Sequence, residues 1–221
     1  GGARLAKSVP VAKKPASRTP PDIIDDLTPQ SRLNTSAKIE DARIEGLDMS
    51  GETVRALAAG GSVFERISFS GCSMPSLRLR DVRLIRCDLS NAVLTGSELV
   101  RVEFIECRLT GMKAIECKWK DVLLEGCEGG YAQFNESELA GCEFRDTQLR
   151  EADFRSADLQ GAKFAHTALN RADFSRAKLA GADLRGADIE GVTLRTEDIR
   201  GATVTTAQAL DLVLLLGIVI G

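Results

Sequence analysis

The stretch ADFRSADLQG, residues 152–161, contains two consecutive copies of one five-residue unit. In each copy a small residue comes first and a large apolar residue comes third. Stepping by five from Ile44 to Val204 visits 33 positions, of which 30 are Leu, Ile, Phe, Val, Met or Trp, and all eight phenylalanines lie among them. Neither the 3.6-residue period of a helix nor the two-residue period of a strand gives this pattern. It predicts a repeat architecture in which each short unit stacks on its neighbours and does not fold alone.

A second set of positions, two residues before each apolar centre, is occupied by small residues. All six cysteines lie in this set, and they form neither a CxxC pair nor a zinc-ligand spacing with a histidine. Their confinement to one small, inward position favours core packing and a reducing, cytoplasmic setting over a disulfide framework, which an even number of cysteines leaves as the alternative. The six are Cys72, Cys87, Cys107, Cys117, Cys127 and Cys142.

The units at 152–156, 157–161 and 182–186 resemble the pentapeptide repeat family, whose consensus is A(D/N)LXX. The match covers roughly residues 42–204 and is cleanest from 132 to 202. The resemblance implies an all-β solenoid, a right-handed quadrilateral β-helix in which four units make one square coil of 20 residues. Coils would stack about 4.8 Å apart, the spacing of paired strands. The 33 apolar positions then correspond to about eight coils.

This arrangement predicts which side chains stack, because residues 20 apart should lie on the same face. Cys87, Cys107 and Cys127 should share one column. The single tryptophan, Trp119, is oversized for a centre, and the undersized centres Ala114 and Gly129 flank it, as close packing requires. Two ladders of large residues are predicted on opposite faces: Phe104, Leu124, Phe144, Phe164 and Leu184 in one, and Phe134, Phe154 and Phe174 in the other.

The chain divides into three regions. Residues 1–40 form a basic, proline-rich N-terminal tail in which 1–21 are expected to be flexible and 22–28 to dock on the first coil. Residues 41–204 form the β-helix. Within it, residues 50–61 are predicted to be a short helical insertion, with Ser50 as N-cap and Gly60–Gly61 as the stop, although two irregular repeats are the alternative.

Residues 205–221 are expected to cap the open end of the solenoid. The run from Thr205 to Gly217 is predicted to be a helix, too short and too interrupted by Asp211 to span a membrane. Quinolone-resistance members of the family dimerise through such a cap, so the resemblance implies a homodimer through this segment. The expected dimerisation residues are Leu210, Val213, Leu214, Leu216, Ile218 and Ile220.

A search for catalytic chemistry gives little. The only histidine, His166, is expected to point outward at a corner, and no strained nucleophile turn or phosphate-binding glycine loop accompanies it. We therefore expect a non-enzymatic protein with no catalytic residue, no cofactor and no metal site.

Function must then depend on the surface. Residues 1–40 carry seven basic and four acidic side chains, so residues 41–221 carry 22 basic and 28 acidic ones, a net charge of −6. This charge argues against direct nucleic-acid binding by the β-helix. Family members of the quinolone-resistance type mimic DNA and occupy DNA gyrase or topoisomerase IV, and the resemblance implies the same role in antibiotic resistance here. The acidic residues expected to contact that partner are Glu98, Glu138, Asp153, Asp158, Asp173, Asp183, Asp188 and Asp198.

The alternative is a structural scaffold that binds an unrelated protein. It is favoured by three outward apolar residues, Ile85, Ile105 and Leu123, which should form a small exposed patch.

Overall fold

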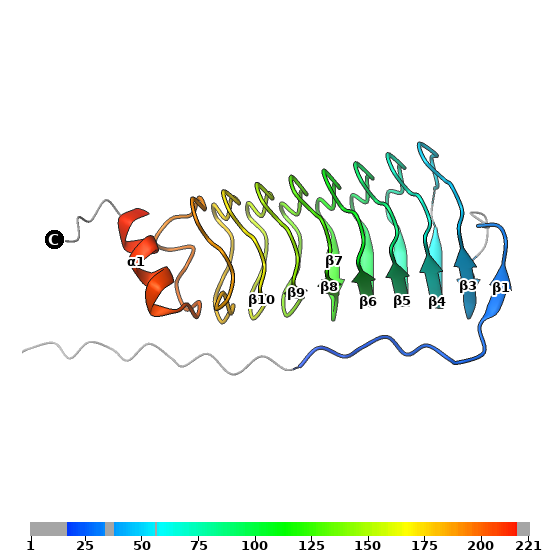
Figure 1. Cartoon of the computed structure of the whole chain (residues 1–221), viewed down its shortest axis with the longest axis horizontal. Coiled ribbons are helices and arrows are strands. Elements are labelled where there is room, and N and C mark those ends of the chain that lie inside the picture. Colours follow the sequence, from blue (N-terminus) through cyan, green and yellow to red (C-terminus); the bar gives the residue numbers. More distant parts are fainter. Residues whose placement is uncertain (1–16, 34–37, 56, 216–221) are drawn as a thin grey trace, which may run out of the picture.

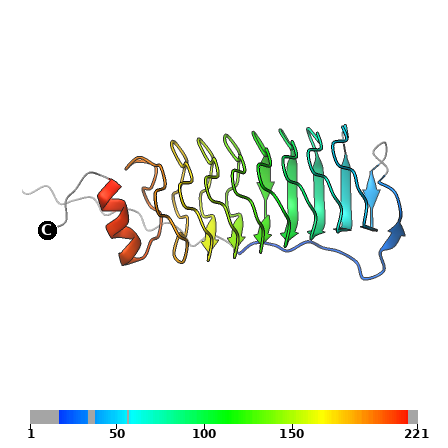
Figure 2. The ribbon, with the colours of Figure 1, turned by 45° about the horizontal axis from the view of Figure 1, so that its top comes forward.

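The computed structural model describes residues 17–33, 38–55 and 57–215. Its backbone winds into a β-solenoid, a stack of coils that runs from β1 at one end to helix α1 (Thr206–Leu215) at the other (Figure 1). Figure 2 shows that the coils in the middle of the solenoid follow one another along the same path. No helix within the described ranges has the length and hydropathy that crossing a membrane requires.

The strands form one sheet in which every pairing is parallel, in the order β1-β3-β4-β5-β6-β8-β9-β10, with β2 beside β4 and β7 beside β6. The first two are short: β1 is Thr28–Gln30 and β2 is Ile39–Glu40. The others are β3 (Ala42–Glu45), β4 (Ala58–Glu65), β5 (Arg78–Ile85), β6 (Glu98–Ile105), β7 (Lys118–Lys120), β8 (Leu123–Glu125), β9 (Glu143–Arg145) and β10 (Lys163–Ala165).

The register confirms a coil of 20 residues. Ile44 pairs with Phe64, and five further 20-residue steps lead to Phe164 along the continuous ladder. Isolated bridges carry the same register on to Thr203, which pairs with Asp183. Because most N–H groups of the ladder find a carbonyl one coil away, the strands are satisfied without any antiparallel partner. The handedness of the coil and its square cross-section stay predictions of the resemblance.

The apolar centres fill a narrow core, as predicted. Phe144 stacks on Phe164 with ring centroids 4.7 Å apart, and Phe154 stacks on both Phe134 and Phe174 at 5.0 Å. The two ladders meet edge to face, with 6.1 Å between the centroids of Phe144 and Phe154. Such offset and perpendicular contacts are the favoured geometries of aromatic pairs.

Trp119 fits this core with the help of its undersized neighbours. Its ring stacks on Phe104 at 5.8 Å and meets Phe134 edge-on at 5.6 Å. Gly129 has no room for a side chain, because an added Cβ would lie 2.9 Å from Cδ2 of Leu149. The indole nitrogen of Trp119 is buried without a hydrogen-bond partner among the described residues, an energetic cost that the repeat pattern did not predict.

The small positions do more than fill space. The thiol of Cys107 donates to the carbonyl oxygen of Leu84, 3.4 Å away and 23 residues earlier. Cys87, Cys127, Thr147 and Thr167 repeat this hydrogen bond in the same column. Cysteine, serine and threonine therefore link successive coils through their side chains as well as packing inside them.

The predicted helix at residues 50–61 is wrong. Val54 N–H donates to the carbonyl of Ser73 in the next coil at 2.8 Å, and Ala59 pairs with Leu79 inside strand β4. A helix would have withdrawn these groups from the ladder and left the next coil unpaired. Gly61, with φ of 56°, serves as a corner within β4 and does not end a helix.

The N-terminal region departs from the expected flexible tail. Strand β1 pairs with β3, so the sheet begins before residue 41. We call residues 17–27 the strap, because this segment runs from β1 back along the outside of the coils toward the middle of the solenoid (Figure 1). Backbone N–H groups of Thr19 and Asp22 bind the carboxylates of Asp121 and Asp81, at 3.1 and 3.0 Å.

Helix α1 covers the C-terminal end and begins with a capping box. Thr205 Oγ1 accepts a hydrogen bond from the Gln208 N–H, and Gln208 Oε1 accepts one from the Thr205 N–H. The amide of Gln208 also donates to the carbonyls of Leu184 and Ala187, each at 2.7 Å. The helix thereby gives the Ala187 carbonyl a partner and adds a second hydrogen bond to the Leu184 carbonyl, which also accepts from the Ala187 N–H. The predicted stop at Gly217 lies outside the described residues.

Replacing Leu159 by Ala removes a fully buried centre. We expect the free energy of unfolding to fall by about 2–5 kcal/mol, because a rigid, closely packed core collapses poorly around the cavity. Chemical denaturation measures the change. Gln160→Ala, at the exposed neighbouring position, is the control, and equal stability of L159A and wild type would contradict the inward assignment.

Replacing Gln208 by Ala should destabilise the capped end. We expect a loss of about 1–3 kcal/mol, since the Ala187 carbonyl and the helix N-cap lose their partner together and the Leu184 carbonyl loses one of its two donors. Hydrogen exchange of residues near 184–208 should rise before exchange in the central coils. Asp211→Ala, on the exposed side of the same helix, should leave this exchange unchanged.

Candidate functional site

The side chains with nucleophilic or metal-binding chemistry are either sealed in the core or isolated on the surface. All six cysteines are free and buried, and burial raises the pKa of the Cys117 thiol to about 11. The imidazole of His166 is 79 % exposed at a corner and contacts only Asp146 in the described chain, with 3.3 Å between Nδ1 and Oδ1. The described residues also contain no group of three His, Cys, Asp or Glu side chains placed to hold a metal ion.

The predicted acidic residues do not form one face. Glu98, Glu138 and Asp158 share a column in which Lys118 separates the first two, Glu138 and Asp158 are neighbours, and Lys178 follows Asp158. The others lie in three different columns of the coil, Asp153 with Asp173 in one, Asp183 in another and Asp188 in the third. Positions five residues apart occupy successive sides of the coil, so these carboxylates are distributed around its circumference.

Basic residues neutralise most of these carboxylates. Arg155 Nη2 lies 2.6 Å from Asp153 Oδ2 and its Nε lies 3.8 Å from Asp173 Oδ2, so one guanidinium separates two stacked aspartates. Arg185 donates to Asp183 at 2.6 Å, and this hydrogen bond lowers the pKa of Asp183. The surface therefore offers alternating charge where a DNA-like stripe needs a continuous negative column.

Asp198 is structural. Its side chain is 3 % exposed and accepts hydrogen bonds from the Arg195 guanidinium at 2.8 and 3.0 Å and from the backbone N–H groups of Arg176 and Arg195. The Arg195 side chain is the main reason that the pKa of Asp198 falls to about 2. Asp198 therefore ties together the backbone of the last turns of the solenoid.

The predicted apolar patch is smaller than expected. Ile85 and Ile105 pair in register and are both partly exposed. Leu123 is only 3 % exposed, although its place in the repeat points it outward and it lies outside the core cluster. The exposed patch therefore consists of Ile85 and Ile105.

The predicted dimerisation residues fall partly within the described chain. Leu210 is half exposed on α1, and Val213 is partly buried on the same helix. Leu216, Ile218 and Ile220, and the side chain of Leu214, lie outside the described residues.

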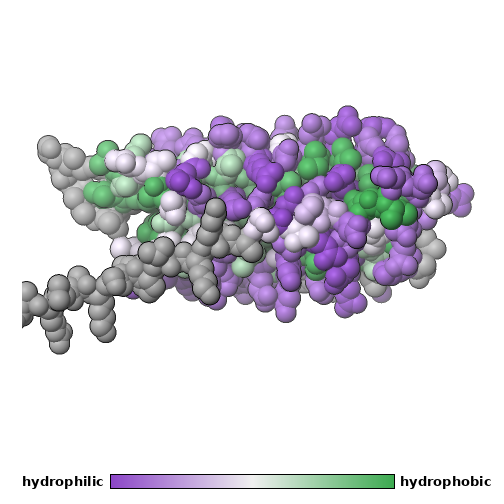
Figure 3. All heavy atoms as spheres, turned by 90° about the horizontal axis from the view of Figure 1, so that it is seen from below, coloured by the Kyte–Doolittle hydropathy of each residue, from purple (hydrophilic) through white to green (hydrophobic). Residues whose placement is uncertain are grey.

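The strap creates a site that the repeat pattern did not reveal. Arg18 Nη2 donates to Glu103 Oε1 at 2.8 Å, and Arg83 Nε donates to Glu103 Oε2 at 2.8 Å. Both the Arg18 and the Glu103 side chains are only 9 % exposed, so this is a sealed ion pair on the outside of the sheet. Figure 3, viewed from the strap side, shows that hydrophilic side chains predominate on the rest of this face.

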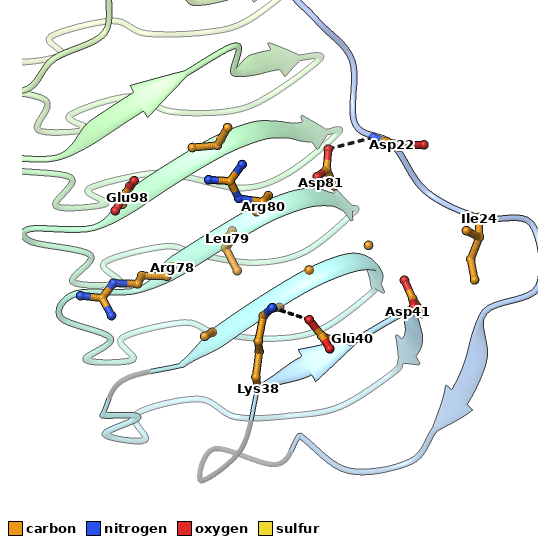
Figure 4. A pocket seen from close by; sticks show the side chains of 15 residues that line it. Asp22, Ile24, Lys38, Glu40, Asp41, Arg78, Leu79, Arg80, Asp81 and Glu98 are labelled. Carbon is orange, nitrogen blue, oxygen red and sulfur yellow. Dashed lines mark hydrogen bonds and ion pairs between the residues drawn. The ribbon is translucent and has the colours of Figure 1, made fainter.

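A groove of about 660 Å³ lies between the strap and the first coils (Figure 4). Asp22 and Ile24 line it from the strap, with Asp22 held to Asp81 by its backbone N–H. On the side of the coils the groove is lined by Gly60 and Gly61, which have no side chains to fill it. Arg80 also lines this side. A second groove, of about 910 Å³, surrounds the exposed Tyr131, whose hydroxyl lies 3.2 Å from Glu151 Oε1.

Comparisons with known proteins agree with the repeat pattern. The profile described as "Pentapeptide repeat region" matches residues 61–134, and that of "Pentapeptide repeats (8 copies)" matches 130–164 and 157–195, so together they span more than half of the 221 residues. No curated protein sequence matches the chain.

A comparison with solved structures found matches with TM-scores below 0.5. A trypsin-treated variant of QnrB1, a plasmid-mediated fluoroquinolone resistance protein, is 25% identical, with 86% of this chain and 93% of that one covered and a TM-score of 0.47. Full-length QnrB1 is 23% identical, with coverage of 86% and 95% and a TM-score of 0.44. HetL, involved in heterocyst differentiation regulation in the cyanobacterium Nostoc sp. strain PCC 7120, is 19% identical, with coverage of 76% and 89% and a TM-score of 0.27.

Replacing Asp198 by Asn should destabilise the protein near neutral pH by about 1–3 kcal/mol, the usual worth of hydrogen bonds to a charged group. The pKa of Asp198 is lower in the folded chain than its ordinary value of 3.8, so its stabilisation is complete above that value and is lost as the pH falls toward about 2. The stability difference between wild type and D198N should therefore shrink over this interval.

Denaturation of both proteins at pH 7 and at about pH 2 measures this difference. Glu197→Gln is the control, because Glu197 also pairs with Arg195 but is mostly exposed. A difference that is independent of pH would show that the Asp198 charge is not what the last coil depends on.

Proposed function

Because the chain belongs to the pentapeptide repeat family, we propose that it is a non-enzymatic rod that binds a protein partner through the outer surface of its coils. The observation that carries this proposal is the division of side chains between inside and outside. The thiols of the described chain are sealed in the core, while charged and polar side chains recur on the outer surface at the spacing of the coils. A regular, rigid surface of this kind suits protein recognition, and it needs no cofactor.

The partner we propose first is DNA gyrase or topoisomerase IV. Two considerations support it: the resemblance to the quinolone-resistance members of the family, and the net charge of −6 over residues 41–221. The exposed members of the predicted acidic set, such as Glu98 and Glu138, would then meet the basic surface that these enzymes present to DNA. Direct nucleic-acid binding is not part of this proposal, since like charges repel.

A second candidate is an unrelated protein partner, and a specific observation favours it. The ion pairs of the described surface leave little continuous negative charge, whereas Ile85 and Ile105 lie side by side in adjacent strands, partly exposed. An apolar centre with a polar rim is the usual anatomy of a protein interface. Binding there would make the chain an interaction scaffold.

We also propose that the active form is a homodimer through the C-terminal segment. The support is the half-exposed Leu210 on α1, an apolar side chain on the outer side of the capping helix. Light scattering at roughly micromolar concentration should give twice the monomer mass of 23.8 kDa. The monomer mass for wild type would contradict the dimer, and L210D should dissociate it.

The partner is tested by titrating the protein into a DNA supercoiling assay, with and without a fluoroquinolone. Inhibition at roughly micromolar protein, or rescue of supercoiling from the drug, is expected if the topoisomerase is the partner. The effect should weaken as salt rises, because contacts that replace phosphates are screened. No effect on either enzyme would contradict this partner.

Ile105→Asp separates the two candidates. If the apolar pair is the contact, I105D should abolish binding while unfolding stays cooperative, and binding by the wild type should be nearly indifferent to salt. If the acidic surface is the contact, I105D should bind as the wild type does and E138K should bind more weakly. Thr110→Asp, a charge placed on a different side of the coil, serves as the matched control.

A further inference from the structure

The strap is seated on a corner of the solenoid whose geometry matches one kind of peptide. Asp41, Asp81 and Asp121 occupy the same corner at alternate coils, each with φ between 47° and 58°. Aspartate tolerates this left-handed conformation, so the corner can present a row of carboxylates. Arg101, at the same corner of the intervening coil, binds Asp81 through two hydrogen bonds of 2.5 Å and holds its carboxylate in place.

The spacing of these carboxylates is the repeat of a polyproline II helix. Asp81 and Asp121 are two coils apart, about 9.6 Å at the usual distance between strands. Thr19 and Asp22, whose N–H groups bind them, are three residues apart, and three residues of polyproline II rise about 9.3 Å and complete one turn. Both N–H groups therefore point to the same side of the strap.

The residues between the two donors are Pro20 and Pro21. Proline favours this extended conformation and has no N–H to leave unpaired, so the two positions that do not bind an aspartate have no donor to satisfy. Arg18 then reaches the sealed carboxylate of Glu103. The corner thus recognises three features of the bound segment: an arginine, a pair of prolines, and two N–H groups spaced by one turn of polyproline II helix.

The present occupant lies on the surface, and its printed polar contacts with the coils are made by Arg18, Thr19 and Asp22. No residue of the strap is fully buried, whereas Glu103 and Leu123 are 7 % and 3 % exposed. Two nitrogens of Arg18, Nε and Nη1, are buried without a hydrogen-bond partner among the described residues. The groove of about 660 Å³ beside Ile24 and Gly61 also offers room for a bulkier segment.

We propose that this corner is a docking site for an extended, proline-rich segment of a partner protein that carries an arginine before its prolines, and that the strap occupies the site until the partner displaces it. This inference rests on the proposed function as a protein-binding rod and identifies one surface that it uses. Recognition follows the general mode of polyproline II ligands, which bind with little loss of conformational entropy. The Asp81 and Asp121 carboxylates replace the aromatic grooves that usually receive such ligands.

The test uses the full chain and a fluorescent peptide with the sequence of residues 17–28, SRTPPDIIDDLT. In the wild type the tethered strap competes at an effective concentration on the order of millimolar, so the added peptide should bind poorly. Arg18→Glu places a carboxylate against Glu103 and should release the strap. We expect the peptide to bind R18E at least about tenfold more tightly than wild type, with a matching rise in hydrogen exchange at Thr19 and Asp22.

Matched variants make the result specific. Arg32→Glu changes the charge of an exposed arginine beyond β1 and should leave peptide binding and strap exchange as in wild type. A peptide with its own arginine changed to Glu, or with both prolines changed to Ala, should not bind R18E. Circular dichroism checks the fold of each variant, and the milder Arg18→Gln is measured beside R18E in case charge reversal disturbs the coils.

The proposal is overturned if the peptide binds R18E and R18Q no more tightly than wild type, or if the proline-free peptide binds equally well. Because the assay contains only this protein and a peptide, its outcome is independent of whether a topoisomerase is the partner. A negative result would remove this docking site and leave the proposed function to the supercoiling assay.

Discussion

Backbone hydrogen bonds between successive coils, which pair residues 20 apart in register, hold every other feature of this protein in place. They set one residue of each coil directly above its counterpart, so any property of a position becomes a column along the solenoid. In the core this stacking turns single phenylalanines into continuous ladders with centroids 4.7 to 5.0 Å apart. The side-chain donors of Cys107 and its column reinforce the same connection from inside.

The same ladder decides what the surface can do. Stacking places like charges close together unless basic side chains intervene. Lys118 lies between Glu98 and Glu138, whereas Glu138 and Asp158 stack directly. Arg155 performs the same task between Asp153 and Asp173. Such pairs on an exposed surface contribute little stability, but they prevent repulsion along the column. This arrangement weakens the resemblance to a uniform polyanion. Selective recognition must then come from local features, such as the corner that binds the strap or the Ile85–Ile105 pair.

The two ends are closed by different means. At the C-terminal end, one side chain, Gln208, caps both the helix and the last coil. At the N-terminal end, β1 adds to the sheet through backbone pairing. The strap then extends along the outside and holds Glu103, a carboxylate that would otherwise be paired only with Arg83. An exposed sheet edge is a template for aggregation, so the cover that α1 provides protects the C-terminal end, whereas β1 is the outer strand of the described sheet.

The sequence by itself determined the coil. A five-residue period in which Phe144, Phe164 and their counterparts alternate with small residues has one consistent solution, because every inward position must be buried and every coil must repeat the one before. Local signals were less reliable. Ser50 and Gly61 resemble the start and stop of a helix, but the segment between them continues the ladder. Ala59 pairs with Leu79 in the next coil, so the tertiary pairing decided against the helix. Only the tertiary structure decided where the non-repeating residues lie. The contact between Arg18 and Glu103 joins positions 85 residues apart, and the N–H of Arg176 reaches Asp198 across 22 residues. Polar contacts of this kind leave no periodic trace in a sequence, since their partners are chosen by proximity after the coils have formed.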